Sequence, residues 1–234
     1  MDRRKFIGVC SASLAALQMR SWASQDTNIF KLYSRTRLTL PSGETLQARQ
    51  LTSKTGYVFH YPYVSTPNLL LRLSTPIDIP TGLKNTAGQT YSGVGGVGPE
   101  RTIVAFSAIC PHQLSYLSKT KSFINYRADT SAVAKRDNVI VCCAHHSVYD
   151  PSTGGRVISG PAPEPLTGIV LQHDSADDAL YAMGTAGDEL FNAFFRAYKI
   201  ELIEAYGRGV AKQLVKDTAV VQTVRDYVAK PILC

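Results

Sequence analysis

The sequence predicts an all-β fold, an antiparallel sandwich or barrel, followed by a helical C-terminal extension. Between residues 38 and 184 the apolar segments are short and rich in β-branched and aromatic residues, which is typical of strands. Turn-forming stretches such as STGG at 152–155 and GPAPEP at 160–165 separate them, and this favours antiparallel strands over βαβ units. With 44% hydrophobic and 18% charged residues, the 234-residue chain can bury a full core.

The N-terminus, residues 1–24, has the layout of an export signal. MDRRKFIGVCSASLAALQMRSWASQ combines a basic start, a short apolar run from Phe6 to Leu17 and small residues around Ala23. The pair Arg3-Arg4 is similar to a twin-arginine signal, which exports folded proteins. We therefore expect a signal or an uncleaved N-terminal anchor, and a protein on the periplasmic side of the bacterial inner membrane, anchored or soluble. A basic amphipathic helix is the alternative.

Seven strands are expected within a domain that spans residues 30–185. They are YVFHYPY at 57–63, NLLLRL at 68–73, TIVAFSAI at 102–109, NVIV at 138–141, RVI at 156–158, GIVLQ at 168–172 and ALYAM at 179–183.

Residues 186–234 are predicted to form a helical C-terminal extension. In GDELFNAFFRAYKIELIEAYGRG, aromatic and apolar residues from Phe191 to Ala205 recur at steps of three and four, with Asp188 as N-cap and Gly207 near the end. We expect this stripe to pack on the sheet domain or on a partner subunit. After Val210 the pattern fits helix and returning strand equally poorly.

Charge and hydropathy exclude two classes of protein. The net charge is +7, but Lys and Arg are scattered among Asp and Glu without a long basic run, so we predict no nucleic-acid partner. No stretch of 18 uninterrupted apolar residues occurs, which excludes a polytopic membrane protein and leaves membrane attachment through the N-terminus.

Two short stretches carry metal-ligand chemistry. Cys110-Pro-His112 and Cys142-x-x-His145 each supply one thiol and one imidazole. Tetrahedral zinc usually takes its cysteines from one half of a site and its histidines from the other, whereas blue copper takes a single cysteine and an axial ligand that is often methionine. In a Rieske 2Fe-2S centre, two cysteines hold one iron and two histidines the other. The mixed pairs favour the Rieske centre over zinc.

The wider sequence resembles a known family. CPHQLS from Cys110, CCAHHSVYDPSTGGRVISGPAPEPL from Cys142 and the later LYAMG resemble the Rieske iron-sulfur proteins of quinol-oxidising cytochrome bc complexes, over residues 100–184. The resemblance implies a Rieske-type antiparallel β-sandwich with a cluster-binding part at about 105–165. It implies one 2Fe-2S cluster per chain, covered by the loop from Gly160 to Pro163, with the metal ligands Cys110, His112, Cys142 and His145.

The resemblance also assigns two hydroxyl groups to the cofactor. Ser147 would bond a bridging sulfide and Tyr149 the sulfur of Cys110, and such donors stabilise the extra electron. They raise the reduction potential within a range of roughly −150 to +300 mV for Rieske centres. Oxygenase-type ferredoxins of low potential usually have tryptophan at the position of Ser147, so the sequence predicts the high-potential type.

The expected function is high-potential electron transfer. By resemblance, the chain takes electrons, with protons, from a quinol-type donor and passes them to a cytochrome, as one subunit of a respiratory complex of the quinol:cytochrome c reductase type. No separate catalytic residues are expected. The alternative is a small Rieske subunit or soluble partner of another periplasmic oxidoreductase, such as the molybdenum enzyme arsenite oxidase. A low-potential oxygenase ferredoxin is less favoured.

Several positions depart from the family pattern. Many members brace the two ligand loops with a disulfide, whereas Ser115 and Ala144 stand at the corresponding positions, so another contact must hold the loops. Cys143 and His146 form a second C-x-x-H pair, one residue out of register, and we prefer the pair that aligns Ser147 and Tyr149 with the family. Cys10 and Cys234 have no expected role. The remaining histidines, His60, His146 and His173, are expected to be ordinary surface or core residues.

Overall fold

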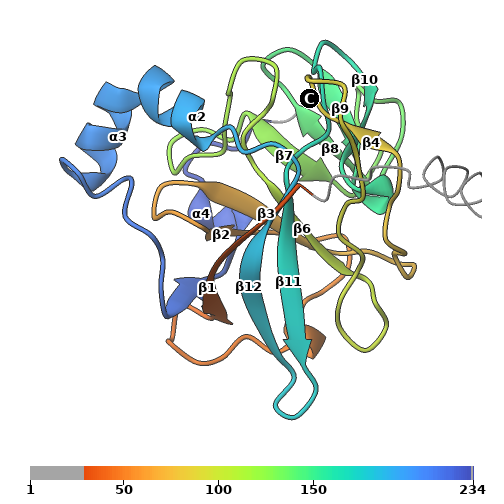
Figure 1. The fold of residues 1–234 in the computed structure, drawn as a ribbon, viewed down its shortest axis with the longest axis vertical. Helices are drawn as coiled ribbons and strands as arrows, with labels where there is room; N and C mark the ends of the chain where they lie inside the picture. The colour runs from red at the N-terminus through yellow and green to blue at the C-terminus, as the bar shows by residue number, and fades with distance from the viewer. Residues whose placement is uncertain (1–28, 233) are drawn as a thin grey trace, which may run out of the picture.

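The computed structural model describes residues 29–232 and 234 (Figure 1). The export signal predicted for residues 1–24 lies outside the described residues and stays a prediction. Within the described part, no helix is both long and apolar enough to cross a membrane.

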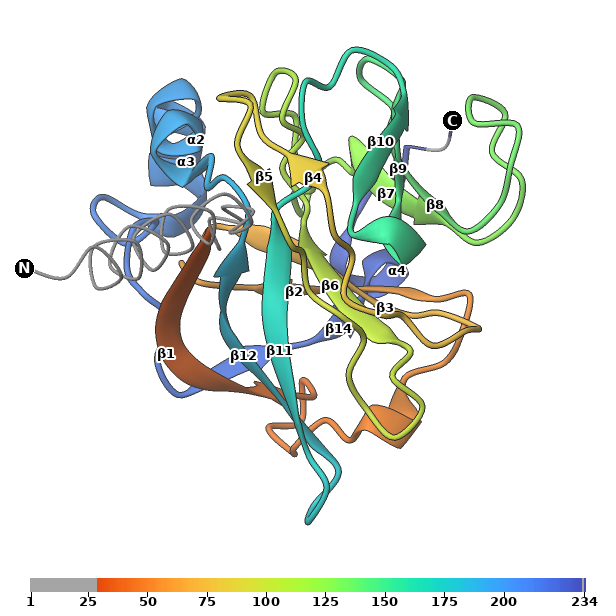
Figure 2. The same cartoon turned by 45° about the vertical axis from the view of Figure 1, so that its right-hand side comes forward.

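Eight strands form one large, nearly closed sheet (Figures 1 and 2). Their order is β13-β1-β12-β11-β6-β3-β2-β14, and all neighbours are antiparallel except β1 and β13. β13 and β14 lie at opposite ends of this order, yet only Val221 separates them in the chain, so the two edges approach each other. The bounds are β1 (Phe30–Thr39), β2 (Gly56–His60), β3 (Pro67–Arg72), β6 (Ile103–Ser107), β11 (Gly168–Asp174), β12 (Ala179–Ala186), β13 (Thr218–Val220) and β14 (Gln222–Thr223).

A second sheet of four strands carries the upper part of the molecule in Figure 1. Its order is β10-β9-β8-β7, and each strand runs antiparallel to its neighbours. The bounds are β7 (Ile124–Arg127), β8 (Val139–Cys142), β9 (Ser147–Asp150) and β10 (Arg156–Ser159), with the hairpin of β4 (Leu83–Lys84) and β5 (Thr90–Tyr91) alongside and two short 3-10 helices at Ala48–Gln50 and Pro151–Thr153.

β3 belongs to the cores on both faces of the large sheet. Successive side chains of a strand point to opposite faces, so Leu69 and Leu71 pack in one cluster and Leu70 in another. The first cluster continues through Phe106 into Ile140 of the four-stranded sheet. This burial on both faces explains why β3 contains three consecutive leucines, Leu69 to Leu71, rather than an alternating pattern.

The all-β prediction is confirmed. All seven expected strands are present, as β2, β3, β6, β8, β10, β11 and β12. Five strands of the β domain were not predicted. They are β1, whose residues alternate only weakly, the short strands β4, β5 and β7, and β9, whose SVYD was interpreted only as part of the ligand motif. The tail, for which the sequence left helix and strand open, contains both: β13, β14 and the short helix α4 (Val224–Tyr227).

The predicted single helix after Gly187 is two helices, α2 (Phe191–Ala197) and α3 (Lys199–Tyr206), which meet at Tyr198. Asp188 is not the N-cap: that position is Leu190, and the Asp188 carboxylate instead accepts a hydrogen bond of 2.9 Å from the Asn85 side chain. Gly207 ends α3 as expected, with a positive φ of 94°.

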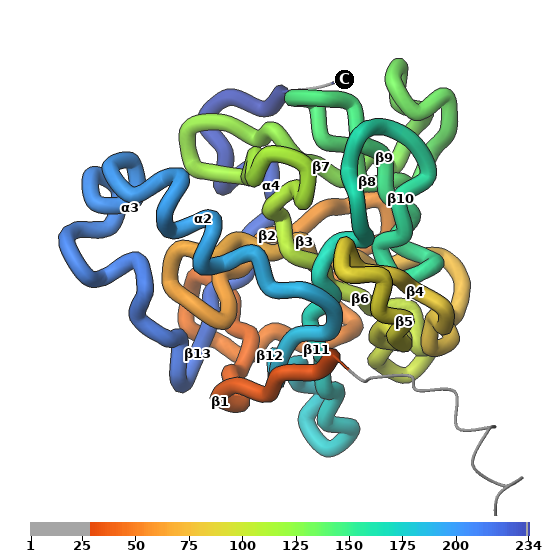
Figure 3. The backbone as a smooth tube through the Cα atoms, turned by 45° about the horizontal axis from the view of Figure 1, so that its top comes forward, coloured from red at the N-terminus to blue at the C-terminus, as the bar shows by residue number. Residues whose placement is uncertain are grey.

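The aromatic stripe of these helices is mostly buried against the protein itself. Phe191, Phe194 and Phe195 pack with Leu202 around Tyr116, which belongs to the segment after β6. Ala205 alone of the predicted stripe is exposed. Of the two expected surfaces, the chain's own β domain is thus the one that covers the stripe, and Figure 3 shows α2 and α3 to one side of the four-stranded sheet.

Candidate metal centre

The first ligand motif lies in a compact loop, residues 110–117, directly after β6. The Cys110 N–H donates to the carbonyl of Ser115 at 2.8 Å, and the Leu114 N–H donates to the carbonyl of Cys110 at 2.9 Å. Leu114 has a positive φ of 58°, so the chain turns sharply there. This first loop leaves Cys110 fully buried, His112 half-buried and Gln113 exposed.

The second ligand motif is the turn between β8 and β9, residues 142–147. Cys142 ends β8 and pairs with Ser147, the first residue of β9. The His146 N–H donates to the Cys142 carbonyl at 2.8 Å, and His146 has a positive φ of 61°. This second loop buries Cys142 and exposes His145 and His146.

The two loops place the four ligand candidates in two pairs, thiol beside thiol and imidazole beside imidazole. Cys110 and Cys142, both free and buried, are hydrogen-bonded to each other. The rings of His112 and His145 lie edge to face, with centroids 4.8 Å apart and an interplanar angle of 82°. Among the described residues, no three His, Cys, Asp or Glu side chains surround one point as ligands of a single ion.

The donor set fits a cluster in two further respects. Nδ1 of His112 is buried and has no hydrogen-bond partner among the described residues, which is costly unless the nitrogen binds something else. The hydrogen bond from Cys142 lowers the pKa of Cys110 to about 6 against the opposing effect of burial, and the same contact raises the pKa of Cys142. A thiol that ionises readily is suited to metal binding, because the thiolate is the ligand.

Tyr149, which lies on β9, contacts one of the two thiols. Its hydroxyl is 3.1 Å from Sγ of Cys110, and the side chain is fully buried. Burial, together with the negative charge of Cys110, raises the pKa of the phenol. The phenol therefore stays protonated, and its hydroxyl donates a hydrogen bond to the sulfur.

Ser147 ties the second loop to the loop formed by residues 160–163. Its buried hydroxyl oxygen accepts a hydrogen bond of 3.2 Å from the Ala162 N–H and keeps its own hydrogen to donate. Gly160 has a positive φ of 91°, and a Cβ there would lie only 2.5 Å from Cα of Ser147. The close approach therefore requires glycine, and the 160–163 loop covers the second loop.

Cys143 is joined by a disulfide to Cys234, with Cα atoms 5.6 Å apart. Strand alternation explains the different roles of the two adjacent cysteines. Ile140 and Cys142 face the core that contains Tyr149, whereas Val139 and Val141 face the opposite cluster, where Cys234 packs. Only the Cys142/His145 register has a free thiol, so Cys143 and His146 cannot serve as the ligand pair in this state.

This disulfide was not predicted from the sequence. The ligand pattern suggested Cys143 only as an alternative ligand and gave Cys234 no role. A signal was nevertheless present, because one pair of cysteines, Cys143 and Cys234, remains outside the signal-like N-terminal segment after two ligands are assigned.

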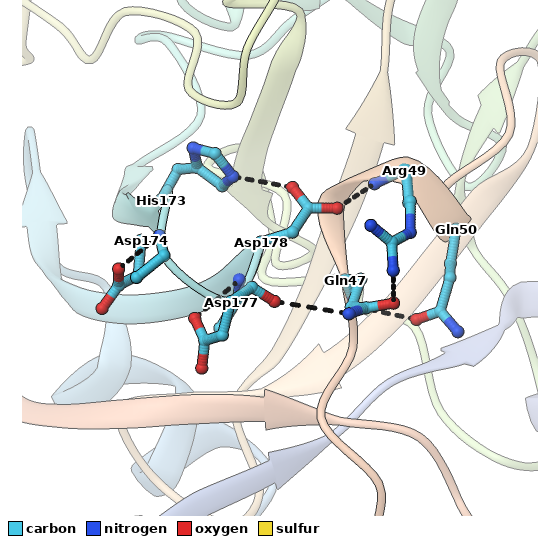
Figure 4. A network of polar contacts seen from close by, with 9 residues as sticks. Gln47, Arg49, Gln50, His173, Asp174, Asp177 and Asp178 are labelled. Carbon is cyan, nitrogen blue, oxygen red and sulfur yellow. Dashed lines mark hydrogen bonds and ion pairs between the residues drawn. The ribbon is translucent and has the colours of Figure 1, made fainter.

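His173 and His60 lie outside the site. Nε2 of His173 lies 2.8 Å from the Asp178 carboxylate at the β11–β12 turn, and that carboxylate also accepts from the Arg49 N–H (Figure 4). Slight burial raises the pKa of Asp178, but these two hydrogen bonds outweigh it and hold the pKa below its usual value. His60 contacts the hydroxyls of Tyr206 and Tyr227 at 3.4 and 3.2 Å.

Two thiols side by side and two imidazoles side by side form the donor arrangement that a Rieske centre requires. Residues 89–172 match the family model of the Rieske [2Fe-2S] domain. This range contains both ligand loops and the 160–163 loop. The chain therefore carries a Rieske domain that binds a 2Fe-2S cluster and transfers electrons.

Two curated relatives are described as iodate reductase subunit IdrB. The protein of Pseudomonas sp. (strain SCT) is 29% identical over 194 residues, 80% of each chain. That of Denitromonas iodatirespirans is 33% identical over 129 residues, 55% of this chain and 54% of the relative. Among solved structures, the soluble domain of the Rieske protein II (soxF) from Sulfolobus acidocaldarius is similar, with 28% identity, a TM-score of 0.46 and coverage of 69% of this chain and 82% of that one.

Proposed function

We propose that this protein is the Rieske electron-transfer subunit of a periplasmic oxidoreductase related to iodate reductase, with Cys110, His112, Cys142 and His145 as the cluster ligands. The observation that carries the ligand assignment is the pairing of two buried thiols and two adjacent imidazoles across the loops. The similarity to the iodate reductase subunit of Pseudomonas sp. (strain SCT), which covers 80% of each chain, supports this host complex. The signal-like residues 1–24 support a location in the periplasm or at the outer face of the inner membrane.

When bound, the cluster takes up and releases one electron. The protein's own groups define how this happens. Cys110 and Cys142 lie in an apolar core that excludes water, and the hydroxyls of Tyr149 and Ser147 are placed to stabilise added negative charge. His145 lies at the exposed end of the site, where a redox partner can approach closely. This arrangement favours a high-potential electron carrier.

A second function, electron transfer from quinol to a cytochrome within a bc-type complex, is supported by the presence of both Ser147 and Tyr149. Two features argue against a bc-type complex. Gln113 is exposed at the tip, where an apolar residue commonly shields the cluster in that family, and Ser115 and Ala144 cannot form its bracing disulfide.

Electron paramagnetic resonance of the purified holoprotein tests the cluster and its potential. Spectra would be recorded untreated, after ascorbate and after dithionite, with iron and zinc counted on the same sample. We expect a Rieske-type signal after ascorbate and two irons per chain. A signal that needs dithionite would contradict the high-potential type, and zinc without a signal would contradict the 2Fe-2S cluster.

The host complex requires a separate measurement. The full chain would be tagged in the cells that make it and purified under mild conditions, and the molybdenum and haem in the preparation would be counted. Molybdenum with little b-type haem supports the proposed oxidoreductase. Stoichiometric b- and c-type haem without molybdenum would favour the quinol:cytochrome c reductase instead.

A further inference from the structure

The first loop is fastened to the C-terminal helices by Tyr116. Its ring lies edge-on to Phe194 and Tyr198, with centroid distances of 4.9 and 4.8 Å. Its hydroxyl donates a hydrogen bond of 2.6 Å to the carboxylate of Glu201 on α3. Leu114 of the same loop packs in this aromatic cluster. The position of the first loop is therefore set by α2 and α3.

The second loop is fastened to the end of the same C-terminal segment. The Cys143–Cys234 disulfide joins residues that are 91 positions apart in the chain. The Cys143 N–H also donates to the carbonyl of Phe123 at 2.6 Å. Cys143, the neighbour of Cys142, is therefore held both by a covalent bond to Cys234 and by a hydrogen bond to Phe123.

Between these two points, residues 229–232 and Cys234 contact the linker that connects the loops. In Figure 2 the C-terminus lies beside the four-stranded sheet. Side-chain and backbone groups of the linker hold this segment at several points. The hydrogen bonds are Ala229 N–H to Lys119 O at 2.8 Å, Ile232 N–H to Ser122 Oγ at 2.9 Å, Asn125 Nδ2 to Ile232 O at 2.9 Å and Ser131 Oγ to Cys234 O at 3.0 Å.

We propose that residues 191–232, together with Cys234, form a two-point clamp that positions the two cluster-binding loops. One point is the contact of Tyr116 with Glu201, and the other is the Cys143–Cys234 disulfide. The clamp takes the place of the inter-loop disulfide that Ser115 and Ala144 cannot form. The inference rests on the ligand set proposed above, because it is the ligands in these loops that the clamp holds at a constant separation.

Among the described residues, each loop is otherwise held by short turns and a few hydrogen bonds, such as those of the second loop to Phe123 and Ala162. A loop that opens admits water to the sulfurs and changes the hydrogen bonds that set the potential. Tyr116, Glu201, Cys143 and Cys234 are thus positioning residues, because they act on the cluster through the loops. Loosening either point should affect both the retention of the cluster and its spectrum, whereas a contact that only stabilises the fold would leave the spectrum of the folded protein unchanged.

The first point is tested with Y116F and E201A, with E201Q as the conservative variant that can still accept the hydrogen bond. Y206F and E204Q, on the same helix, are the matched controls. The full-length holoproteins would be incubated with an iron chelator, and the visible absorption of the cluster followed. We expect Y116F and E201A to lose the cluster about fivefold faster than wild type, with an altered resonance line shape and a shifted reduction potential. E201Q and both controls should behave as wild type.

The second point is tested with the C143S/C234S double variant. Mass spectrometry of unfolded, alkylated wild type should find Cys143 and Cys234 unmodified until a reductant is added. We expect the double variant to lose its cluster faster than wild type by a similar factor, and combination with Y116F to increase the rate further. If the double variant does not fold, the disulfide mapping and the Y116F series decide the proposal.

Two results would overturn the clamp: alkylation of Cys143 and Cys234 in the unreduced wild type, or cluster loss and spectra of the folded variants identical to those of wild type. These failures differ from failure of the proposed function. A wild-type protein without any cluster signal would contradict the ligand assignment. A normal wild-type signal that the variants leave unchanged would contradict the clamp alone.

Discussion

The hydroxyl of Tyr149 lies 3.1 Å from the sulfur of Cys110, and both groups are completely buried. Because hydrogen bonds strengthen as the acceptor gains negative charge, this contact stabilises the reduced site more than the oxidised one. The buried phenol cannot be replaced there by water, since the surrounding core excludes it.

Tyr149→Phe should lower the reduction potential. If the lost bond differs by about 1 kcal/mol between the two redox states, the shift is about 40 mV for one electron. A redox titration monitored by electron paramagnetic resonance measures it. Tyr57→Phe removes a hydroxyl that bonds Thr52, away from the thiols, and should leave the potential unchanged. An unaltered potential in Tyr149→Phe would show that the contact is structural only.

Ser147→Ala should lower the potential and also reduce stability. The change removes the acceptor for the Ala162 N–H and leaves a buried donor unpaired, which costs about 1–3 kcal/mol of unfolding free energy. Ser65→Ala is the matched control, since Ser65 is equally buried and bonds the carbonyl of Ala211. It should lose stability but keep the potential. Equal potentials in the two variants would contradict a role of Ser147 in setting the potential.

Gly160→Ala should loosen the 160–163 loop. The added Cβ would collide with the backbone of Ser147, so the loop must move away from the second loop and expose the cluster to solvent. Gly43 also has a positive φ, 88°, but no atom lies within 4 Å of the position that a methyl group would take there, so Gly43→Ala isolates the cost of the backbone conformation. We expect faster cluster loss to a chelator in Gly160→Ala only, and equal rates in both variants would refute the covering role.

His60 should make the fold sensitive to acid. Burial lowers its pKa from 6.5 to about 4, with a smaller effect of Lys119, and it faces Tyr206 of α3 and Tyr227 of α4. Between pH 6.5 and 4 the unfolded chain binds a proton that the folded chain does not, so stability falls as the pH falls through this range. Relative to His60→Gln, wild type should lose about 2 kcal/mol between pH 8 and pH 4.5.

Urea unfolding of wild type and His60→Gln at the two pH values measures this difference. Comparing the change with pH, rather than the stability at one pH, removes the cost of the substitution itself. A difference between the two proteins that is the same at pH 8 and pH 4.5 would mean that His60 titrates normally in the folded state.

The sequence by itself determined seven of the strands and the two ligand motifs, because both kinds of pattern are local. Period-2 alternation and β-branched runs identify strands such as β2 and β11, and C-x-H and C-x-x-H place a thiol and an imidazole within one turn. The amphipathic stripe from Phe191 also predicted helix correctly, although not the break at Tyr198. Spacing of this kind can be recognised in a single segment.

Only the tertiary structure decided which segments hold the site. Tyr116 and Glu201 are 85 residues apart, and Cys143 and Cys234 are 91 residues apart. No periodicity links residues so distant in the chain, because their contact depends on how the whole sheet closes. The face of β8 that meets the core likewise decides that Cys142, and not Cys143, lies in the same cluster as Cys110 and Tyr149. The sequence thus specified the ligand types, and the packing of the C-terminal segment specified what surrounds them.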